Sequence, residues 1–110
     1  MMRLNKYRIM WIFVFFDLPT NTFDERKAAA RFRKDIITDG FDMFQFSIYK
    51  RHCTSLENAN VHIARVKKML PDKGYVCMMT FTDKQFGMME LYFGRVVQSI
   101  PAPVKQLQLF

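Results

Sequence analysis

The feature that most constrains this sequence is an apolar run near its start, residues 9–17 (IMWIFVFFD). Both alternating sets of side chains in the run are apolar, a pattern typical of a strand buried on both faces. The run is short, and β-branched and aromatic residues dominate it, which favours a central β-strand over a helix. Leu18-Pro19 ends this strand, because proline cannot donate a hydrogen bond to a neighbouring strand.

Capping signals predict two helices. Residues 22–25 (TFDE) form a capping box, and the helix runs to about Asp39, where Gly40 can adopt the left-handed closing conformation. Residues 54–57 (TSLE) form a second box, and that helix ends before Pro71. The apolar positions at helical spacing are Ala29, Phe32 and Ile36 in the first helix and Leu56, Ala59, Ile63, Val66 and Leu70 in the second.

The remaining segments predict strands. Residues 41–53 (FDMFQFSIYKRHC) alternate in polarity and form one strand, or two with a bulge between them, although no glycine-rich hairpin turn is present. Residues 75–81 (YVCMMTF) form another buried strand. The order predicts one α+β domain over residues 1–110, a ferredoxin-like βαββαβ sandwich whose antiparallel sheet carries both helices on one face. Residues 95–110 form an extended C-terminal strand that we expect to pair with a mate or a partner.

The charge balance points to a polyanionic partner. The chain has 17 Lys and Arg against 10 Asp and Glu, a net charge of +7, and such a field attracts nucleic acid. The alternative is a solvated cationic face. No aromatic residue is interleaved with the basic ones as a base-stacking platform requires, so we expect contacts to the phosphate backbone of a duplex. The candidate residues are Arg26, Lys27, Arg31 and Lys34 in the first helix, with Lys50 and Arg51 at the end of the second strand.

Several protein classes are excluded. Cys53 and Cys77 belong to no CxxC motif and no histidine cluster, so we expect two reduced thiols rather than a zinc site or a disulfide scaffold. The apolar run near the start is too short to span a bilayer, and no signal-peptide cleavage site follows it. We therefore expect a cytoplasmic protein that does not associate with a membrane. The 12 Phe and 9 Met residues exceed what a small domain can bury, which indicates an interface with another chain.

Asp17 is the strongest candidate for chemistry. It lies at the carboxyl end of an apolar strand, where ligands often bind in α/β sheets, and its carboxylate can hold Mg²⁺. The other interpretation is a strand-ending residue that helps a turn. Ser47 could orient Asp17 or simply complete a strand. His52 and His62 have no obvious acid partner, and we expect His62 on the surface of the second helix, so Asp17 is catalytic only if the protein is a nuclease.

These motifs together resemble the CRISPR-associated protein 2 family. The first strand of that family ends in an aromatic-Asp-aliphatic triplet, matched by residues 16–18 (FDL). Its second strand carries Gln-x-Ser followed by an aliphatic and an aromatic residue, matched by residues 45–49 (QFSIY), and a later Thr-Asp matches residues 82–83. The resemblance spans residues 9–86. The Asp-Leu-Pro form and the leucine-rich tail are most similar to members from systems that encode the Cas9 effector.

The resemblance implies a ferredoxin-like fold and a homodimer that bridges two dimers of the integrase, CRISPR-associated protein 1. It also implies that the two Asp17 side chains meet near the dimer axis, where one Mg²⁺ would bind. We therefore expect a DNA-binding scaffold that holds duplex protospacer DNA during spacer acquisition, with the Cas9 effector as a further candidate partner. The alternative is a Mg²⁺-dependent endonuclease, acting on RNA or DNA through the paired Asp17 carboxylates. A third interpretation, a small-ligand sensor, rests on fold analogy alone.

Overall fold

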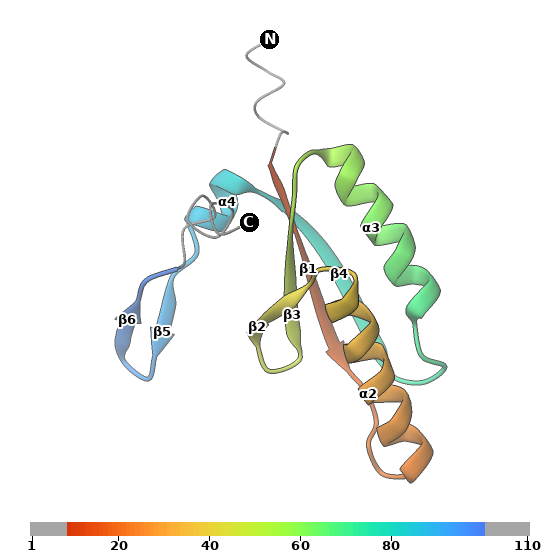
Figure 1. Cartoon of the computed structure of the whole chain (residues 1–110). Helices are drawn as coiled ribbons and strands as arrows, with labels where there is room; N and C mark the ends of the chain where they lie inside the picture. Colours follow the sequence, from red (N-terminus) through yellow and green to blue (C-terminus); the bar gives the residue numbers. More distant parts are fainter. Residues whose placement is uncertain (1–8, 101–110) are drawn as a thin grey trace.

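A four-stranded antiparallel sheet with the order β2-β3-β1-β4 forms the centre of the molecule (Figure 1). The computed structural model describes residues 9–100. β1 (Met10–Asp17) lies inside the sheet, between β3 (Ile48–Cys53) and β4 (Tyr75–Thr82), and β2 (Asp42–Gln45) pairs with β3 at the outer edge. This order confirms the predicted ferredoxin-like βαββαβ fold, with β1 as its central strand.

α2 (Phe23–Thr38) begins and ends as its sequence predicts. The Thr22 hydroxyl accepts a hydrogen bond from the Glu25 amide at 3.1 Å, and the Glu25 carboxylate accepts one from the Thr22 amide, also at 3.1 Å. Beyond the C-terminus, Gly40 has φ of 101°, the left-handed conformation that glycine adopts without steric conflict. The buried residues of α2 are the predicted ones, Ala29, Phe32 and Ile36.

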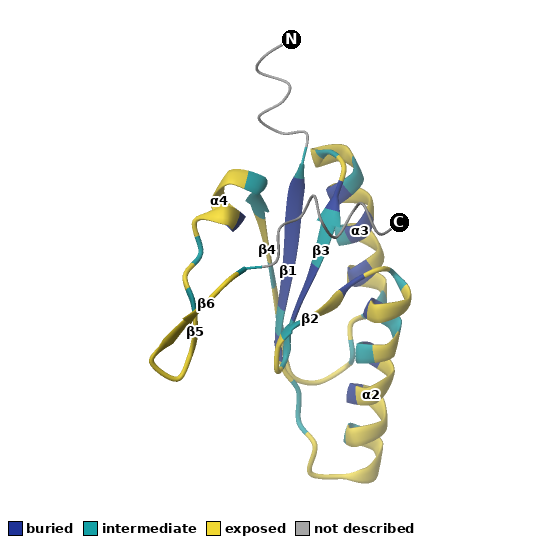
Figure 2. Cartoon of the chain, turned by 60° about the vertical axis from the view of Figure 1, so that its left-hand side comes forward, coloured by how far each residue is buried: buried dark blue, intermediate teal, exposed yellow. Residues whose placement is uncertain are grey.

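α3 (Leu56–Met69) covers the same face of the sheet as α2 (Figures 1 and 2). Its N-cap is Ser55, whose hydroxyl accepts from the Asn58 amide at 3.0 Å. The Asn58 side-chain oxygen accepts from the Thr54 amide at 3.3 Å. The sequence predicted Thr54 as the N-cap and Glu57 as its partner, whereas the structure has Ser55 as the N-cap, one position later. Serine is as good an N-cap residue as threonine.

β1 separates two apolar clusters, one on each face of the sheet. Its alternate residues enter alternate clusters, which confirms the two predicted sets, and Figure 2 shows the concentration of buried residues in this strand. The helix-side cluster contains Met10, Ile12, Val14, Phe16, Phe32, Ile36, Phe41, Tyr49, Cys53, Ala59 and Val66. The other cluster contains Trp11, Phe13 and Phe86, with Phe15, Phe44, Ile48, Phe81, Met89 and Ile100 partly buried against it. The helix side therefore holds the larger core.

β2 and β3 form a hairpin whose turn contains no glycine. Gln45 pairs with Ile48, so Phe46 and Ser47 make a two-residue turn, and the register shifts between Met43 and Gln45. Ser47 has φ of 64°, and tight hairpin turns of this length require a residue with positive φ. Of the two predicted alternatives, the one with two strands is confirmed, but a turn joins the strands and the bulge lies within β2 rather than between them. Serine reaches the left-handed region at a modest steric cost, so glycine was not needed.

β4 is an edge strand, and the prediction that residues 75–81 are buried is wrong. In the described part of the chain it pairs only with β1. Tyr75 is 81% exposed and Met79 is 53% exposed, because no described element covers these side chains on the face opposite the helices. Apolar composition alone indicated burial here, whereas Tyr75, Cys77 and Met79 are exposed and Val76, Met78 and Phe81 are only partly buried against the two clusters.

α4 (Asp83–Gly87) follows β4, and then a separate hairpin of β5 (Leu91–Phe93) and β6 (Val96–Gln98). Figure 1 shows this hairpin standing away from the main sheet. Part of the predicted extended tail is therefore β6, paired with its own chain, and residues 101–110 lie outside the described residues. Between residues 9 and 100, no helix combines the length and apolar composition needed to cross a membrane.

Candidate metal and nucleic-acid sites

Asp17 ends β1, and its side chain is exposed. It pairs with Tyr75 of β4 and alternates onto the same face as Phe13, which is the face opposite the helices. The segment before β4 approaches closely: a Cβ atom on Gly74 would lie 2.8 Å from the Asp17 carbonyl oxygen, and Gly74 has φ of 96°. Glycine is needed at position 74 for both reasons, so the end of β1 is held firmly between its neighbours.

The 46–47 turn lies beside the same strand end. The Ser47 carbonyl accepts a hydrogen bond from the Phe16 amide at 3.1 Å. Within the described residues, no hydrogen bond joins the side chains of Ser47 and Asp17. Of the two roles considered for Ser47, the structure supports the structural one, a turn residue that completes the pairing of β1.

A single chain offers little to a metal ion at Asp17. Among residues 9–100, no group of three or more His, Cys, Asp or Glu side chains could hold a metal ion. Mg²⁺ prefers octahedral coordination by oxygen atoms and is often held by one or two carboxylates together with water and substrate phosphate. Asp17 fits such a site only in part, and a second carboxylate would have to come from another chain.

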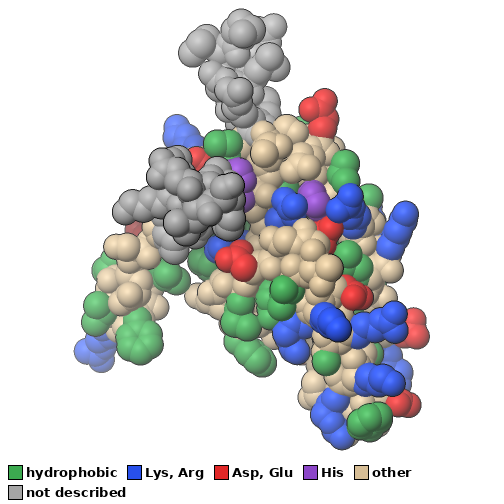
Figure 3. Space-filling model, viewed as in Figure 1, with side chains coloured by type: hydrophobic (Ala, Val, Ile, Leu, Met, Phe, Trp, Pro, Cys, Tyr) green, Lys and Arg blue, Asp and Glu red, His purple; other side chains and the backbone are tan. Residues whose placement is uncertain are grey.

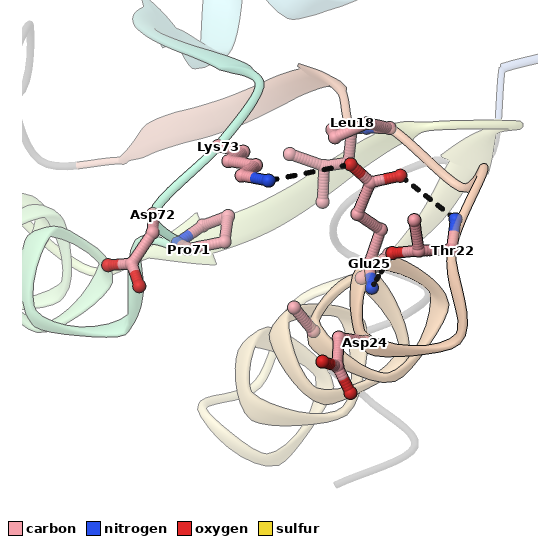
Figure 4. Close-up of a pocket in the computed structure, with 10 residues that line it drawn as sticks. Leu18, Thr22, Asp24, Glu25, Pro71, Asp72 and Lys73 are labelled. Atoms are coloured by element: carbon pink, nitrogen blue, oxygen red, sulfur yellow. Dashed lines mark hydrogen bonds and ion pairs between the residues drawn. The ribbon is translucent and has the colours of Figure 1, made fainter.

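A pocket of about 390 Å³ lies between the start of α2 and the segment that precedes β4 (Figure 4). The Glu25 carboxylate lies 3.8 Å from the Lys73 Nζ atom and accepts hydrogen bonds from the backbone before α2. The hydrogen bond from the Thr22 backbone is the main cause that lowers the pKa of Glu25. Asp24 and Asp72 add two further carboxylates to the lining, so the pocket is acidic and unsuited to a phosphate.

The basic residues of α2 form an exposed row. Lys27, Arg31 and Lys34 are spaced four and three residues apart, which aligns them on the side of the helix that faces away from its buried stripe. Within the described residues, none of them has an ion-pair partner. Arg26 differs, because its guanidinium donates to the Thr20 carbonyl at 3.2 Å and is tied to the segment before the helix. In Figure 3, Lys and Arg side chains gather over α2 and α3.

Lys50 lies apart from this row and is only 4% exposed. Its Nζ atom donates to both carboxylate oxygens of Asp42, at 2.9 and 3.0 Å, and lies 5.6 Å from the centre of the Trp11 ring. The lysine thus joins β2 to β3 across the sheet. A buried ammonium already paired with a carboxylate has little charge to offer a phosphate.

Arg51 is likewise committed to the fold. Its Nε atom donates to the Asp39 carbonyl at 2.8 Å, and its Nη1 atom donates to the His52 carbonyl at 2.7 Å. A Cβ atom on Gly40 would lie 3.0 Å from the Arg51 Nε atom, so only glycine leaves room for the guanidinium. Arg51 satisfies a carbonyl at the end of α2, where helices leave such groups without partners. The expectation that Lys50 and Arg51 share one phosphate-binding surface with α2 does not fit these contacts.

A cluster that the sequence did not indicate joins α2 to α3. His62 is 5% exposed, so the expectation that it lies on the surface is wrong. Its Nδ1 atom lies 2.7 Å from the Asp39 Oδ2 atom, and the Arg65 Nη1 atom donates to Asp39 Oδ1 at 2.9 Å. Burial tends to raise the pKa of Asp39, but these two neighbours outweigh it and hold the pKa below its ordinary value. The missed signal was spacing: His62 lies three residues after Ala59 and four before Val66, on the buried stripe.

Two further titratable groups are partly enclosed. The His52 Nε2 atom is buried without a hydrogen-bond partner, its ring packs edge-on against Trp11 at 5.1 Å, and burial lowers its pKa. Cys53 is buried, and burial raises the pKa of its thiol. Both cysteines are free thiols, as predicted, and Cys77 is exposed.

The family model described as CRISPR associated protein Cas2 matches residues 10–89. The chain is similar to the CRISPR-associated endoribonuclease Cas2 of Flavobacterium psychrophilum, with 56% identity over 108 residues that cover 98% of this chain and 94% of that protein. It is 50% identical over 101 residues to the protein of the same name from Parvibaculum lavamentivorans, covering 92% and 100% of the two chains. Identity to the Paracidovorax avenae protein of that name is 42% over 107 residues, covering 97% and 99%. The matched region includes Asp17, the basic row of α2 and the Asp39–His62 pair.

Proposed function

Because this chain belongs to the Cas2 family of CRISPR-associated proteins, we propose that it is a metal-dependent endoribonuclease with Asp17 as its metal-binding carboxylate. The observation that carries the proposal is the exposed Asp17 at the firmly held end of β1. The three relatives described above are named endoribonucleases, which supports this function more than a role limited to holding DNA.

The proposed active unit is a homodimer, because one chain supplies one carboxylate at this position. The face that carries Asp17 also carries exposed apolar side chains, among them Tyr75 and Met79, which pair with Asp17 and Phe13. Residues directly opposite one another in adjacent strands lie on the same face of a sheet. Phe46, in the turn beside the strand end, is also strongly exposed. An apolar surface of this kind supports burial against a second copy, which would bring two Asp17 side chains together.

Paired Asp17 carboxylates suit Mg²⁺, which binds hard oxygen atoms and retains several water molecules. When bound, such an ion polarises a phosphodiester oxygen and lowers the pKa of a coordinated water molecule. The contribution of this chain is to fix the position of the Asp17 backbone through Gly74 and the pairing with Tyr75. The Mg²⁺ ion and its place on the dimer axis are part of the proposal.

A second candidate function is a DNA-binding scaffold of the CRISPR adaptation complex. The observation that favours it is the exposed row of Lys27, Arg31 and Lys34, whose positive charges suit contacts to the phosphate backbone of a duplex. In this role the dimer would bridge dimers of the CRISPR-associated protein 1 integrase and hold protospacer DNA in the cytoplasm. The Cas9 effector is a further candidate partner.

The two functions are separated by cleavage and binding assays on the same preparations. Wild-type protein and Asp17→Asn are incubated with labelled single-stranded RNA and with duplex DNA, with Mg²⁺ or with EDTA. The endoribonuclease proposal expects RNA cleavage that requires both Mg²⁺ and Asp17. Tight duplex binding without any cleavage by wild-type protein would instead support the scaffold.

A further inference from the structure

We propose that the pocket between the start of α2 and the segment before β4 is a docking site for an arginine side chain, which a segment of a partner protein presents. The proposed function gives this pocket no role, and the inference does not depend on cleavage at Asp17. The pocket has a volume of about 390 Å³. A volume at the lower end of the range for ligand pockets suits one or two side chains rather than a folded element.

Two kinds of surface line the pocket. The apolar lining consists of Leu18, Pro19, Ala28, Ala29 and Pro71. The acidic lining consists of Asp24, Glu25 and Asp72, and Lys73 brings the only basic side chain. Arginine has the same division, because its methylene stem packs on apolar surface while its guanidinium carries the charge. The lining therefore matches both parts of that side chain.

The Glu25 carboxylate has one oxygen atom available to a ligand. Its Oε1 atom accepts hydrogen bonds from the Asn21 amide at 2.8 Å and from the Thr22 amide at 3.1 Å. Its Oε2 atom accepts none from the described residues, because the Lys73 Nζ atom, 3.8 Å away, is beyond hydrogen-bond distance. The Glu25 side chain is 15% exposed, and Oε2 is not among the enclosed unpartnered atoms of residues 9–100. Figure 4 shows this carboxylate reaching from α2 toward the opposite wall.

The local charge selects a cation. The hydrogen bond from the Thr22 backbone is the main cause that lowers the pKa of Glu25, so this carboxylate is ionised near neutral pH. The lining has three carboxylates against one ammonium, whereas the whole chain has a net charge of +7. Such a local excess of negative charge attracts a guanidinium and repels a nucleic-acid phosphate. The planar fork of a guanidinium also matches a carboxylate better than an ammonium does.

The walls of the pocket are fixed before a partner binds. Pro19 and Pro71 have restricted backbone φ angles, one on each wall. The capping box of Thr22 and Glu25 fixes the start of α2. A Cβ atom on Gly74 would lie 2.9 Å from the Pro19 Cδ atom, so the two segments that form the walls are in close contact. A side chain that enters a preformed pocket costs less ordering of the protein.

An exposed aromatic residue beside the pocket favours a protein partner over a small cation. Phe23 is the first residue of α2, follows the lining residue Thr22 in the chain, and is 70% exposed. A single ion pair at a surface is weak, whereas a segment that also covers an aromatic ring buries apolar area. A free guanidinium compound would leave Phe23 uncovered. The occupant is therefore a protein segment in which apolar residues flank the arginine.

The test is an NMR titration of the isotope-labelled whole chain with the peptide acetyl-Leu-Arg-Leu-amide. We expect saturable shifts of the Leu18, Thr22 and Lys73 amide signals. The same peptide with citrulline in place of arginine has an uncharged group of similar shape, and it should bind about tenfold more weakly. Free arginine amide should also bind more weakly than the peptide, and Phe23→Ala should reduce the affinity for the peptide to that level.

Two variants change the pocket itself, and both should lose binding. Glu25→Gln removes the charge but keeps a residue that can complete the capping box. Ala28→Leu fills the pocket with a good helix former. Ala30→Leu, on the same helix but outside the lining, is the matched control and should bind like wild type. Circular dichroism checks the folding of each variant.

Several results would overturn the inference. These are shifts that do not saturate or that fall elsewhere in the chain, equal binding of the citrulline peptide, and wild-type binding by Ala28→Leu. Free arginine amide that binds as tightly as the peptide would show a small-molecule site instead. Displacement of the peptide by duplex DNA would show a nucleic-acid site. If these amide signals shift when the protein alone is concentrated, but not in Ala28→Leu, a second copy of this chain occupies the pocket and no separate partner is needed.

Discussion

The Nδ1 atom of His62 lies 2.7 Å from the Oδ2 atom of Asp39, and this contact fastens α3 to the end of α2. Asp39 is the C-cap residue of a helix with no basic residue in its last turn. A carboxylate at that position is unfavourable, because the C-terminus of a helix carries partial negative charge. His62 and Arg65 compensate the carboxylate, and Arg51 satisfies the Asp39 carbonyl. The junction therefore needs side chains from three elements at once.

Replacing Asp39 by Asn should destabilise the fold. The substitution removes the charge that His62 and Arg65 share, so we expect the free energy of unfolding to fall by about 1–3 kcal/mol. Urea denaturation of both proteins measures the difference. Asp35→Asn on the same helix is the matched control, and an equal loss in that variant would show that the Asp39 contacts add nothing specific.

Stability should also depend on pH through Asp39. Its pKa is lowered in the folded chain relative to the ordinary value of 3.8, so the unfolded state takes up protons first as the pH falls. The contribution of Asp39 is therefore complete above 3.8 and is lost as the pH falls through the folded pKa. Unfolding measured from pH 6 to pH 2.5 should show a steeper acid loss in wild type than in Asp39→Asn. If the free energies of unfolding of the two proteins fell equally with pH, the pKa of Asp39 would not be lowered in the folded chain.

Asp17→Asn should separate chemistry from binding. The side chain is exposed, so its replacement should change the free energy of unfolding by less than about 0.5 kcal/mol. We expect the loss of any Mg²⁺-dependent cleavage, with duplex binding and binding of the CRISPR-associated protein 1 integrase largely retained. Binding is measured by fluorescence anisotropy and by co-purification. A folded Asp17→Asn protein that no longer binds the integrase would show that the roles are not separate.

Salt dependence tests the basic row on α2. If Arg31 contacts a phosphate in each subunit of a dimer, Arg31→Ala should flatten the log-log salt slope of duplex binding by about two units. Two unrelated duplexes of equal length should bind alike, because contacts to the phosphate backbone carry no sequence information. Lys84→Ala, on α4, is the control and should leave the slope unchanged. A slope that Arg31→Ala does not alter would mean that this side of α2 faces water in the complex.

Sedimentation tests the homodimer. The apolar face around Met79 should be covered by a second copy, so Met79→Glu should shift the protein toward a monomer of 13.2 kDa. Val61→Glu, at an exposed position of α3 on the other side of the sheet, should remain dimeric. A wild-type protein that sediments as a monomer at micromolar concentration would contradict the proposed active unit.

The local pattern of the sequence determined the central strand, the first helix and the position of Asp17. An apolar run of both alternating sets predicts β1, and the Thr22–Glu25 capping box predicts the start of α2, because both signals involve residues close in the chain. Asp17 is the last residue of the same run, so its position at the end of β1 is predicted together with the strand. These features are determined by neighbouring residues in the chain, so they do not depend on how the helices pack against the sheet.

Tertiary structure decided which distant side chains meet. His62 and Asp39 are 23 residues apart, and they touch only because α2 and α3 lie side by side on one face of the sheet. Lys50 was one of several basic residues in the sequence, and the pairing of β2 with β3 placed its ammonium against Asp42. The exposure of β4 depended on its position at the sheet edge, which apolar composition does not encode. The repeat of apolar residues, every two positions in a strand and every 3.6 in a helix, specifies only which face of an element is buried. Which side chains of two elements meet depends on how those elements pack against each other.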